Sequence, residues 1–147
     1  MPRTSTTPHL PFIVERPSAL LPQTTQTPYF TVTGRILLTQ IVGEVSVVIA
    51  GVANNATLIS VPTVGAPVDL CGAQAVTAAV LGTFYNITGT LADNMVGTAS
   101  GAVIAQANAI LVTDGTIDLD CTANNTGETK WTLHYIPLDS GSSVAIA

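Results

Sequence analysis

The stretch GTIDLDCTANNTGETKWTLHYIPL, residues 115–138, gives the clearest indication of the fold. Apolar and polar side chains alternate in both halves of it. The apolar positions are Ile117, Leu119 and Cys121 in the first half, and Trp131, Leu133 and Tyr135 in the second. Successive side chains of a β-strand point to opposite faces, so we expect two half-buried strands. The asparagines and the glycine between them suit a tight turn with left-handed backbone positions, which predicts a closing hairpin.

The rest of residues 29–147 repeats this pattern. Short runs rich in Val, Ile and Thr are separated by Gly, Pro, Asn or Asp, at the spacing of about 8–12 residues that is typical of a β-sandwich or barrel. Only the Ala-rich run 74–81 and the segment SGAVIAQANAIL, residues 100–111, could hold a short helix. We therefore expect an all-β, antiparallel sandwich or barrel-like body over residues 29–147.

Residues 1–28 differ from the body. Prolines recur at positions 2, 8, 11, 17, 22 and 28, with Thr, Ser and Gln between them, which favours an extended arm. A disordered tail is the plain alternative. The arm carries more apolar residues than a solvated linker needs, and these are its candidate contacts with a neighbouring subunit: Leu10, Phe12, Ile13, Val14, Leu20 and Leu21.

The composition indicates either a surface that partners cover or one that relies on Thr, Ser, Asn and Gln for its hydration. Hydrophobic residues make up 47% of the chain and charged residues 9%, against about 25% charged in an ordinary domain. From residue 36 onward the sole basic residue is Lys130, facing eight acidic residues, which argues against nucleic acid as a partner. No apolar run is long enough for a membrane helix, and the N-terminus does not resemble a signal peptide. We therefore expect a chain that is not exported, with Cys71 and Cys121 as free thiols.

The residue inventory predicts no catalytic site, no cofactor and no metal. The two histidines, His9 and His134, have no nearby nucleophile and carboxylate in a recognisable arrangement. The run DGTIDLD, residues 114–120, lacks the ligand spacing of a calcium loop, so Asp118 and Asp120 are expected on a solvated strand face. We expect a protein that is not an enzyme.

The proline- and threonine-rich arm, the weakly charged β body and the C-terminal KWTLHYIPLDSGSSV together resemble the capsid decoration, or cement, proteins of tailed bacteriophages. The resemblance implies a β-tulip or jelly-roll type of sandwich that forms a homotrimer. It also implies a structural role on the outer surface of the virion, with assembly in the host cytoplasm. The arm would clasp neighbouring subunits or the major capsid protein.

Two other functions remain open at this point. One is a tail- or neck-associated virion β-protein. The other is a carbohydrate-binding jelly-roll module, which would display aromatic side chains on a sheet face or in loops. A decoration protein needs complementary surface and no active site, so the sequence favours capsid decoration.

Overall fold

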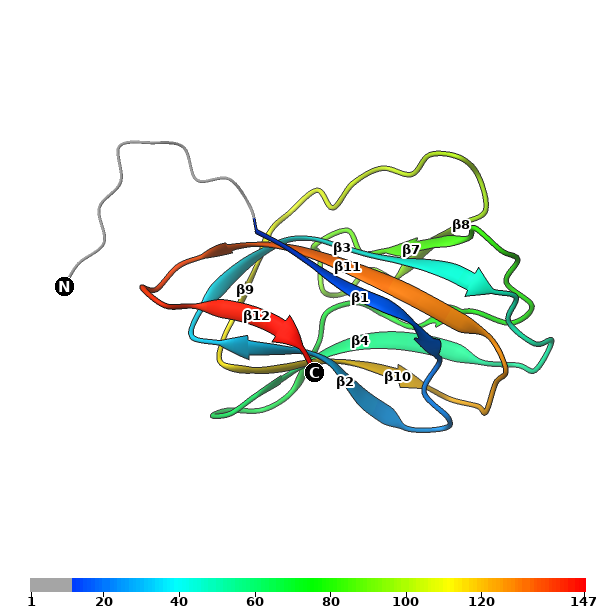
Figure 1. Ribbon diagram of the computed structural model, residues 1–147, viewed down its shortest axis with the longest axis horizontal. Helices are drawn as coiled ribbons and strands as arrows, with labels where there is room; N and C mark the ends of the chain where they lie inside the picture. The colour runs from blue at the N-terminus through cyan, green and yellow to red at the C-terminus, as the bar shows by residue number, and fades with distance from the viewer. Residues whose placement is uncertain (1–11) are drawn as a thin grey trace.

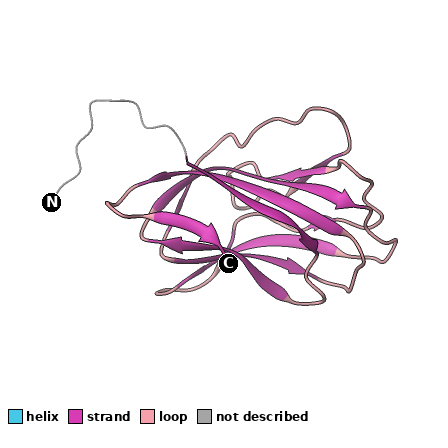
Figure 2. Ribbon diagram, in the orientation of Figure 1, coloured by secondary structure: helices cyan, strands magenta, loops and turns pink. Residues whose placement is uncertain are grey.

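The structure is a computed structural model, and it describes residues 12–147. Strands and loops alone make up this part of the chain (Figure 2), as the expected all-β class requires. The strands are β1 (Phe12–Leu20), β2 (Gln26–Thr33), β3 (Ile36–Val47), β4 (Asn55–Pro62), β5 (Val68–Asp69), β6 (Gln74–Ala75), β7 (Phe84–Asn86), β8 (Val96–Thr98), β9 (Ile110–Val112), β10 (Gly115–Cys121), β11 (Glu128–Pro137) and β12 (Ser143–Ile146). Neither the Ala-rich run 74–81 nor the segment 100–111 forms a helix.

The strands form two antiparallel sheets that pack face to face (Figure 1). The first sheet has the order β1-β11-β3-β7-β8, with β9 also paired to β3. The second has the order β12-β2-β10-β4-β5, with β6 also paired to β4. The antiparallel β-sandwich predicted from the sequence is therefore confirmed.

The core lies between the two sheets and is built from the alternate positions that the sequence indicated. Ile117, Leu119 and Leu133 are fully buried, and Trp131 is 2% exposed. The indole Nε1 of Trp131 donates to Thr129 Oγ1 at 3.0 Å, so the buried ring keeps a hydrogen-bond partner. The Tyr29 ring meets the Trp131 ring edge-on, at 6.3 Å between centroids. These aromatic contacts join the first sheet to the second at the centre of the sandwich.

The predicted closing hairpin is wrong. Strand β10 pairs with β2 and β4, whereas β11 pairs with β1 and β3, so the two strands lie in opposite sheets. Residues 122–127 cross from one sheet to the other, and none of them has a positive φ. Alternation shows which side chains point inward, but it does not identify the strand that lies alongside.

Residues 12–20 and 26–28 of the expected arm belong to the sheets, and residues 21–25 connect them. Strand β1 pairs with β11 along the edge of the first sheet, with a register shift between Arg16 and Ala19. Strand β2 begins at Gln26, so the boundary placed after residue 28 falls inside a strand. Residues 1–11 lie outside the described part of the chain.

Both cysteines are buried free thiols, as the sequence predicts. Burial raises the pKa of the Cys121 thiol to about 12, and it also raises the pKa of Cys71. The thiolate is the reactive form, so both side chains are expected to be inert in the folded protein.

We predict that native protein at pH 8 leaves both thiols unreacted with a thiol reagent over minutes, and that denaturant exposes both at once. Counting the released chromophore before and after denaturation checks this. A thiol that reacts rapidly in the native protein would contradict the burial of that cysteine.

Gly43 makes room for the central tryptophan. It pairs with Trp131 across β3 and β11, and a Cβ placed on Gly43 would lie 2.6 Å from the indole ring. No side-chain atom has space there unless the ring moves.

We therefore predict that Gly43→Ala destabilises the fold by about 1–3 kcal/mol, the usual cost of overpacking a core. The matched control is Gly51→Ala, because a Cβ at Gly51 meets nothing within 4 Å. Urea unfolding followed by Trp131 fluorescence measures both variants. Equal stability of the two variants would show that the packing of the Trp131 ring does not require glycine at position 43.

Candidate interaction surface

Four connections meet at the end of the sandwich where β1 and β3 finish and β4 and β11 begin, on the right in Figure 1. They are residues 21–25, 48–54, 76–83 and 122–127, and we call them together the uncharged end. None of them contains Asp, Glu, Lys, Arg or His. The charged residue Glu128 directly follows the last connection, and its carboxylate accepts a hydrogen bond from Ser18 Oγ at 2.9 Å.

Large apolar side chains are exposed at the uncharged end and at the strand ends that border it. Each is between 45% and 65% exposed. The residues are Leu20, Val47, Val48, Val52, Val80 and Leu81. Leu20 and Val47 flank Glu128 on neighbouring strands, and Ile49 N donates to Ala79 O at 3.0 Å between the two central connections. This end is therefore the candidate interaction surface among the described residues.

Asn54 fixes three of the four connections. Its side chain is 2% exposed, and its Oδ1 accepts from the backbone N–H groups of Thr122 and Ala123 at 3.0 and 3.1 Å. Its backbone N donates to Thr77 Oγ1 at 3.0 Å, and its carbonyl accepts from Val76 N at 2.9 Å. One buried amide residue therefore takes up backbone groups that the turns leave unpaired.

Gln23 and Asn125 attach the fourth connection. Gln23 Nε2 donates to Asn125 O at 2.8 Å, and Gln23 Oε1 accepts from Asn125 N at 2.9 Å. The side-chain oxygen of Asn125 accepts from Gly127 N at 2.9 Å and Ala50 N at 3.3 Å. The exposed valines and leucines therefore stand on connections that are hydrogen-bonded to one another, and a rigid surface loses little entropy on binding.

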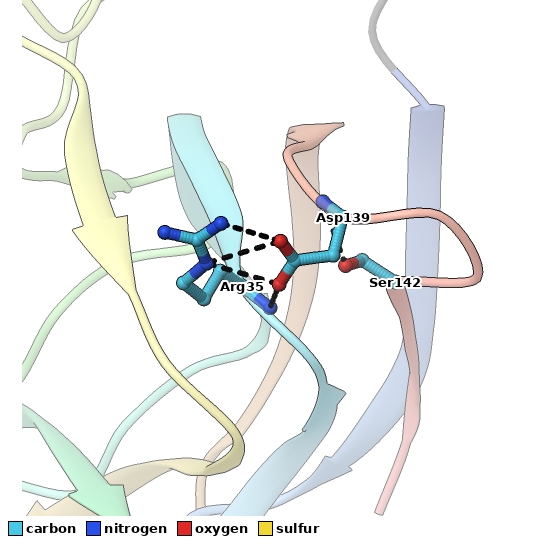
Figure 3. Close-up of polar contacts among 3 residues, drawn as sticks. All are labelled: Arg35, Asp139 and Ser142. Atoms are coloured by element: carbon cyan, nitrogen blue, oxygen red, sulfur yellow. Dashed lines mark hydrogen bonds and ion pairs between the residues drawn. The ribbon is translucent and has the colours of Figure 1, made fainter. Parts of the chain in front are cut away.

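The opposite end of the sandwich is held by charged residues instead. Figure 3 shows Asp139 between Arg35 and Ser142: the Arg35 guanidinium donates to the carboxylate at 2.5–3.1 Å, and Asp139 N donates to Ser142 Oγ at 3.1 Å. Hydrogen bonding to Asp139 and its charge raise the pKa of Arg35. Asp114 accepts from Gly34 N and Thr63 Oγ1, both at 2.9 Å, and these bonds lower its pKa. Charged side chains thus hold the loops at this end of the sandwich, whereas the connections of the uncharged end contain none.

The six arm residues expected at an interface fall into different environments. Leu10 lies outside the described residues. Leu21 is 2% exposed and joins the protein's own core, and Val14 packs against that core. Phe12, Ile13 and Leu20 remain about half exposed, although the Phe12 ring also stacks on Tyr135 at 5.6 Å between centroids. Of the six, the exposed Leu20 borders the uncharged end, and the buried Leu21 is the first residue of its first connection.

The sequence analysis missed the apolar side chains of the connections themselves, Val48, Val52, Val80 and Leu81. The signal that could have found them is present: VIAGVAN (residues 48–54) and VTAAVLGT (76–83) carry no charge although they connect strands. Connections normally lie at the surface and are polar.

The aspartates of DGTIDLD are not arranged as a metal site. Asp114 closes a loop, as described above, and no group of three or more His, Cys, Asp or Glu side chains in residues 12–147 is placed to hold a metal ion. Asp118 is 5% exposed, so the expected solvated position is wrong for this residue. Gln26 Nε2 covers it from β2 and donates to its Oδ2 at 2.8 Å.

No protein-family model, no curated protein and no solved structure matches this chain. Across residues 12–147 there is no helix long and apolar enough to cross a membrane.

We predict that Asn54→Ala destabilises the protein by about 1–3 kcal/mol, because the backbone N–H of Ala123 loses its acceptor. The backbone N–H of Thr122 keeps a second acceptor, Asn55 O, at 3.1 Å. Asn55→Ala is the control, since Asn55 is the exposed neighbour in the chain. Urea unfolding of both variants measures the difference. A loss below 0.5 kcal/mol for Asn54→Ala, on the scale of an ordinary surface change, would show that Asn54 does not hold the connections.

Proposed function

We propose that this chain is a structural virion protein that decorates and stabilises the capsid shell of a phage. In this proposal it acts as a homotrimer bound to the major capsid protein on the outer surface of the shell, after assembly in the host cytoplasm. The observation that carries the proposal is the rigid, uncharged end with its exposed valine and leucine side chains. Such a surface in a weakly charged chain suits a protein that functions with part of its surface covered by another protein.

A protein partner fits this end better than a membrane or a nucleic acid. Binding to anionic lipid or to phosphate needs clustered Lys and Arg, and the four connections contain neither. Each half-exposed Val or Leu side chain retains roughly half of the about 1.5–3 kcal/mol that full burial provides. Many copies on a shell would make weak individual contacts sufficient.

We further propose that the sandwich is a jelly roll. Its principal strands lie in the orders β1-β11-β3-β7 and β2-β10-β4-β5, and the chain moves between the sheets in passing from β1 to β2, β3 and β4. The double-sheet jelly roll occurs in viral capsid proteins and in lectins. The fold alone does not separate these two functions. The exposed side chains at the uncharged end are aliphatic rather than aromatic, which favours the structural role over glycan binding.

The arm is proposed to supply the contacts between subunits. Phe12 and Ile13 are exposed at the start of edge strand β1, where the chain leaves the described sandwich. We therefore assign the apolar contacts of the proposed trimer to Phe12 and Ile13, together with the arm residues that precede them in the sequence.

We predict that the double variant Val48→Lys, Leu81→Lys binds phage heads assembled without this protein at least about tenfold more weakly, a loss of about 1.4 kcal/mol or more. Co-sedimentation with the heads measures binding, and circular dichroism checks the fold. The matched control is Val64→Lys, because Val64 is 88% exposed in the connection between β4 and β5, at the other end of the sandwich. Undiminished binding of the double variant, or an equal loss with Val64→Lys, would refute the proposed surface.

The arm is tested separately by removing residues 1–11. A deletion to residue 28 would also remove β1 and the start of β2, and would test folding instead. The shorter deletion is expected to weaken trimers in light scattering while the unfolding midpoint stays unchanged. If the trimers kept their full stability after this deletion, residues 1–11 would not supply contacts between subunits.

A further inference from the structure

Strand β8 (Val96–Thr98) is the outer edge of the first sheet. It pairs with β7 and with no further strand of that sheet. Exposed edges are usually protected by charge, proline or a bulge. The opposite edge, β1, has all three, in Glu15, Pro17 and its register shift, and β5 carries Asp69. Strand β8 reads Val-Gly-Thr and has none of these.

A cavity of about 420 Å³ lies against the outer face of this edge. Val96 and Thr98 line it from the strand, and Ala102, Val103 and Ala105 line it from the loop that follows. Asn86 Nδ2 donates to Ile104 O at 2.7 Å and so holds the loop above β7. Small alanine side chains leave the space unfilled, and the walls are mostly apolar.

A second pocket, of about 290 Å³, lies on the inner face of the same edge. Gly97 and Tyr85 line it together with Thr77 and Ala79. A Cβ at Gly97 would lie 3.0 Å from the Tyr85 ring and 3.3 Å from Gln74 Nε2, so the missing side chain is what leaves this side open. Neighbouring residues of β8 thus border one pocket on each face of the sheet.

We propose that β8 is a docking site for an extended segment of another protein, which adds to the first sheet as a further strand. Side chains of an added strand alternate between the faces, so one large apolar residue would enter the outer cavity and its neighbours would face the inner pocket. The backbone groups of Val96–Thr98 would pair with those of the segment.

Two further observations favour a polypeptide occupant over a small apolar molecule. Ile104 lines the cavity and is still 87% exposed, so an occupant that extends beyond the cavity would cover more of this side chain. Asn86 is 2% exposed, and its Oδ1 has no hydrogen-bond partner. The backbone of an added strand would lie two strand spacings from β7, so the donor that this oxygen lacks is a side-chain N–H inside the cavity, such as the indole N–H of a Trp. The edge is three residues long, so the apolar side chain in the cavity must supply much of the affinity.

The proposal for β8 goes beyond the decoration role and rests on the open edge and its two pockets. The outer cavity shares no residue with the uncharged end, whereas Thr77, Ala79 and Val80 of the connection 76–83 line the inner pocket. Filling the outer cavity therefore tests β8 binding without altering the uncharged end.

The test is selection from a displayed library of random 12-residue peptides against the full-length protein. We expect enriched peptides with one large apolar residue flanked at alternate positions by small or β-branched residues. Ala102→Phe and Ala105→Phe, which fill the outer cavity, are expected to weaken the selected peptide at least about tenfold. Ala109→Phe is the matched control, because Ala109 is exposed on the same loop and does not line the cavity.

The bound peptide should also slow amide exchange at Val96–Thr98, measured by NMR. A lack of enriched peptides, or equal binding to the cavity-filled variants and the control, would overturn the proposal. Slower amide exchange at β12 on peptide binding would also overturn it. Strand β12 lies at the edge of the second sheet, next to β1, and like β8 it contains no charged residue, so a peptide that binds any unprotected edge could pair there.

Discussion

Three side-chain amides hold the uncharged end in shape, two of them buried and the third partly buried, and the proposed surface depends on them. A connection between two sheets leaves backbone N–H and C=O groups without strand partners, and each buried group left unpaired costs free energy. Asn54, Asn125 and Gln23 take up these groups with neutral hydrogen bonds. The opposite end solves the same problem with Arg35, Asp114 and Asp139. Because amides replace ions at one end, that end can remain apolar and still be rigid.

The two surfaces proposed for this chain use different physics. At the uncharged end, preformed side chains offer apolar area, so binding there would be governed by shape and by the removal of water. At β8, main-chain pairing would set the direction of the partner, and the outer cavity would select its side chain. The first surface suits repeated contacts on a shell. The second suits a single segment of defined sequence.

The sequence predicted the architecture well where the alternation was regular. The inward faces of residues 117–121 and 131–135, including the buried Cys121, follow directly from it. It failed where position depends on a partner strand. The segment 122–127 resembles a hairpin turn, yet it spans two sheets. Asp118 alternates outward as expected, but Gln26 of another strand covers it. The uncharged end could not be recognised as one surface, because its four connections are distant in sequence and meet only after the chain has crossed between the sheets. The two pockets beside β8 depend in the same way on two different segments, residues 102–107 at the outer face and residues 74–80 at the inner face.

The central claim, that the uncharged end is covered in the working state of the protein, is tested most directly by hydroxyl-radical footprinting of the unbound and the head-bound protein. Mass spectrometry would give the oxidation rate of each exposed side chain. We predict that head-bound protein shows slower oxidation than unbound protein at Leu20, Val48, Val52, Val80 and Leu81. The oxidation rate of Val64 is expected to stay unchanged. Unchanged rates at these five residues, together with protection of Val64, would place the contact at the opposite end of the sandwich and contradict the claim.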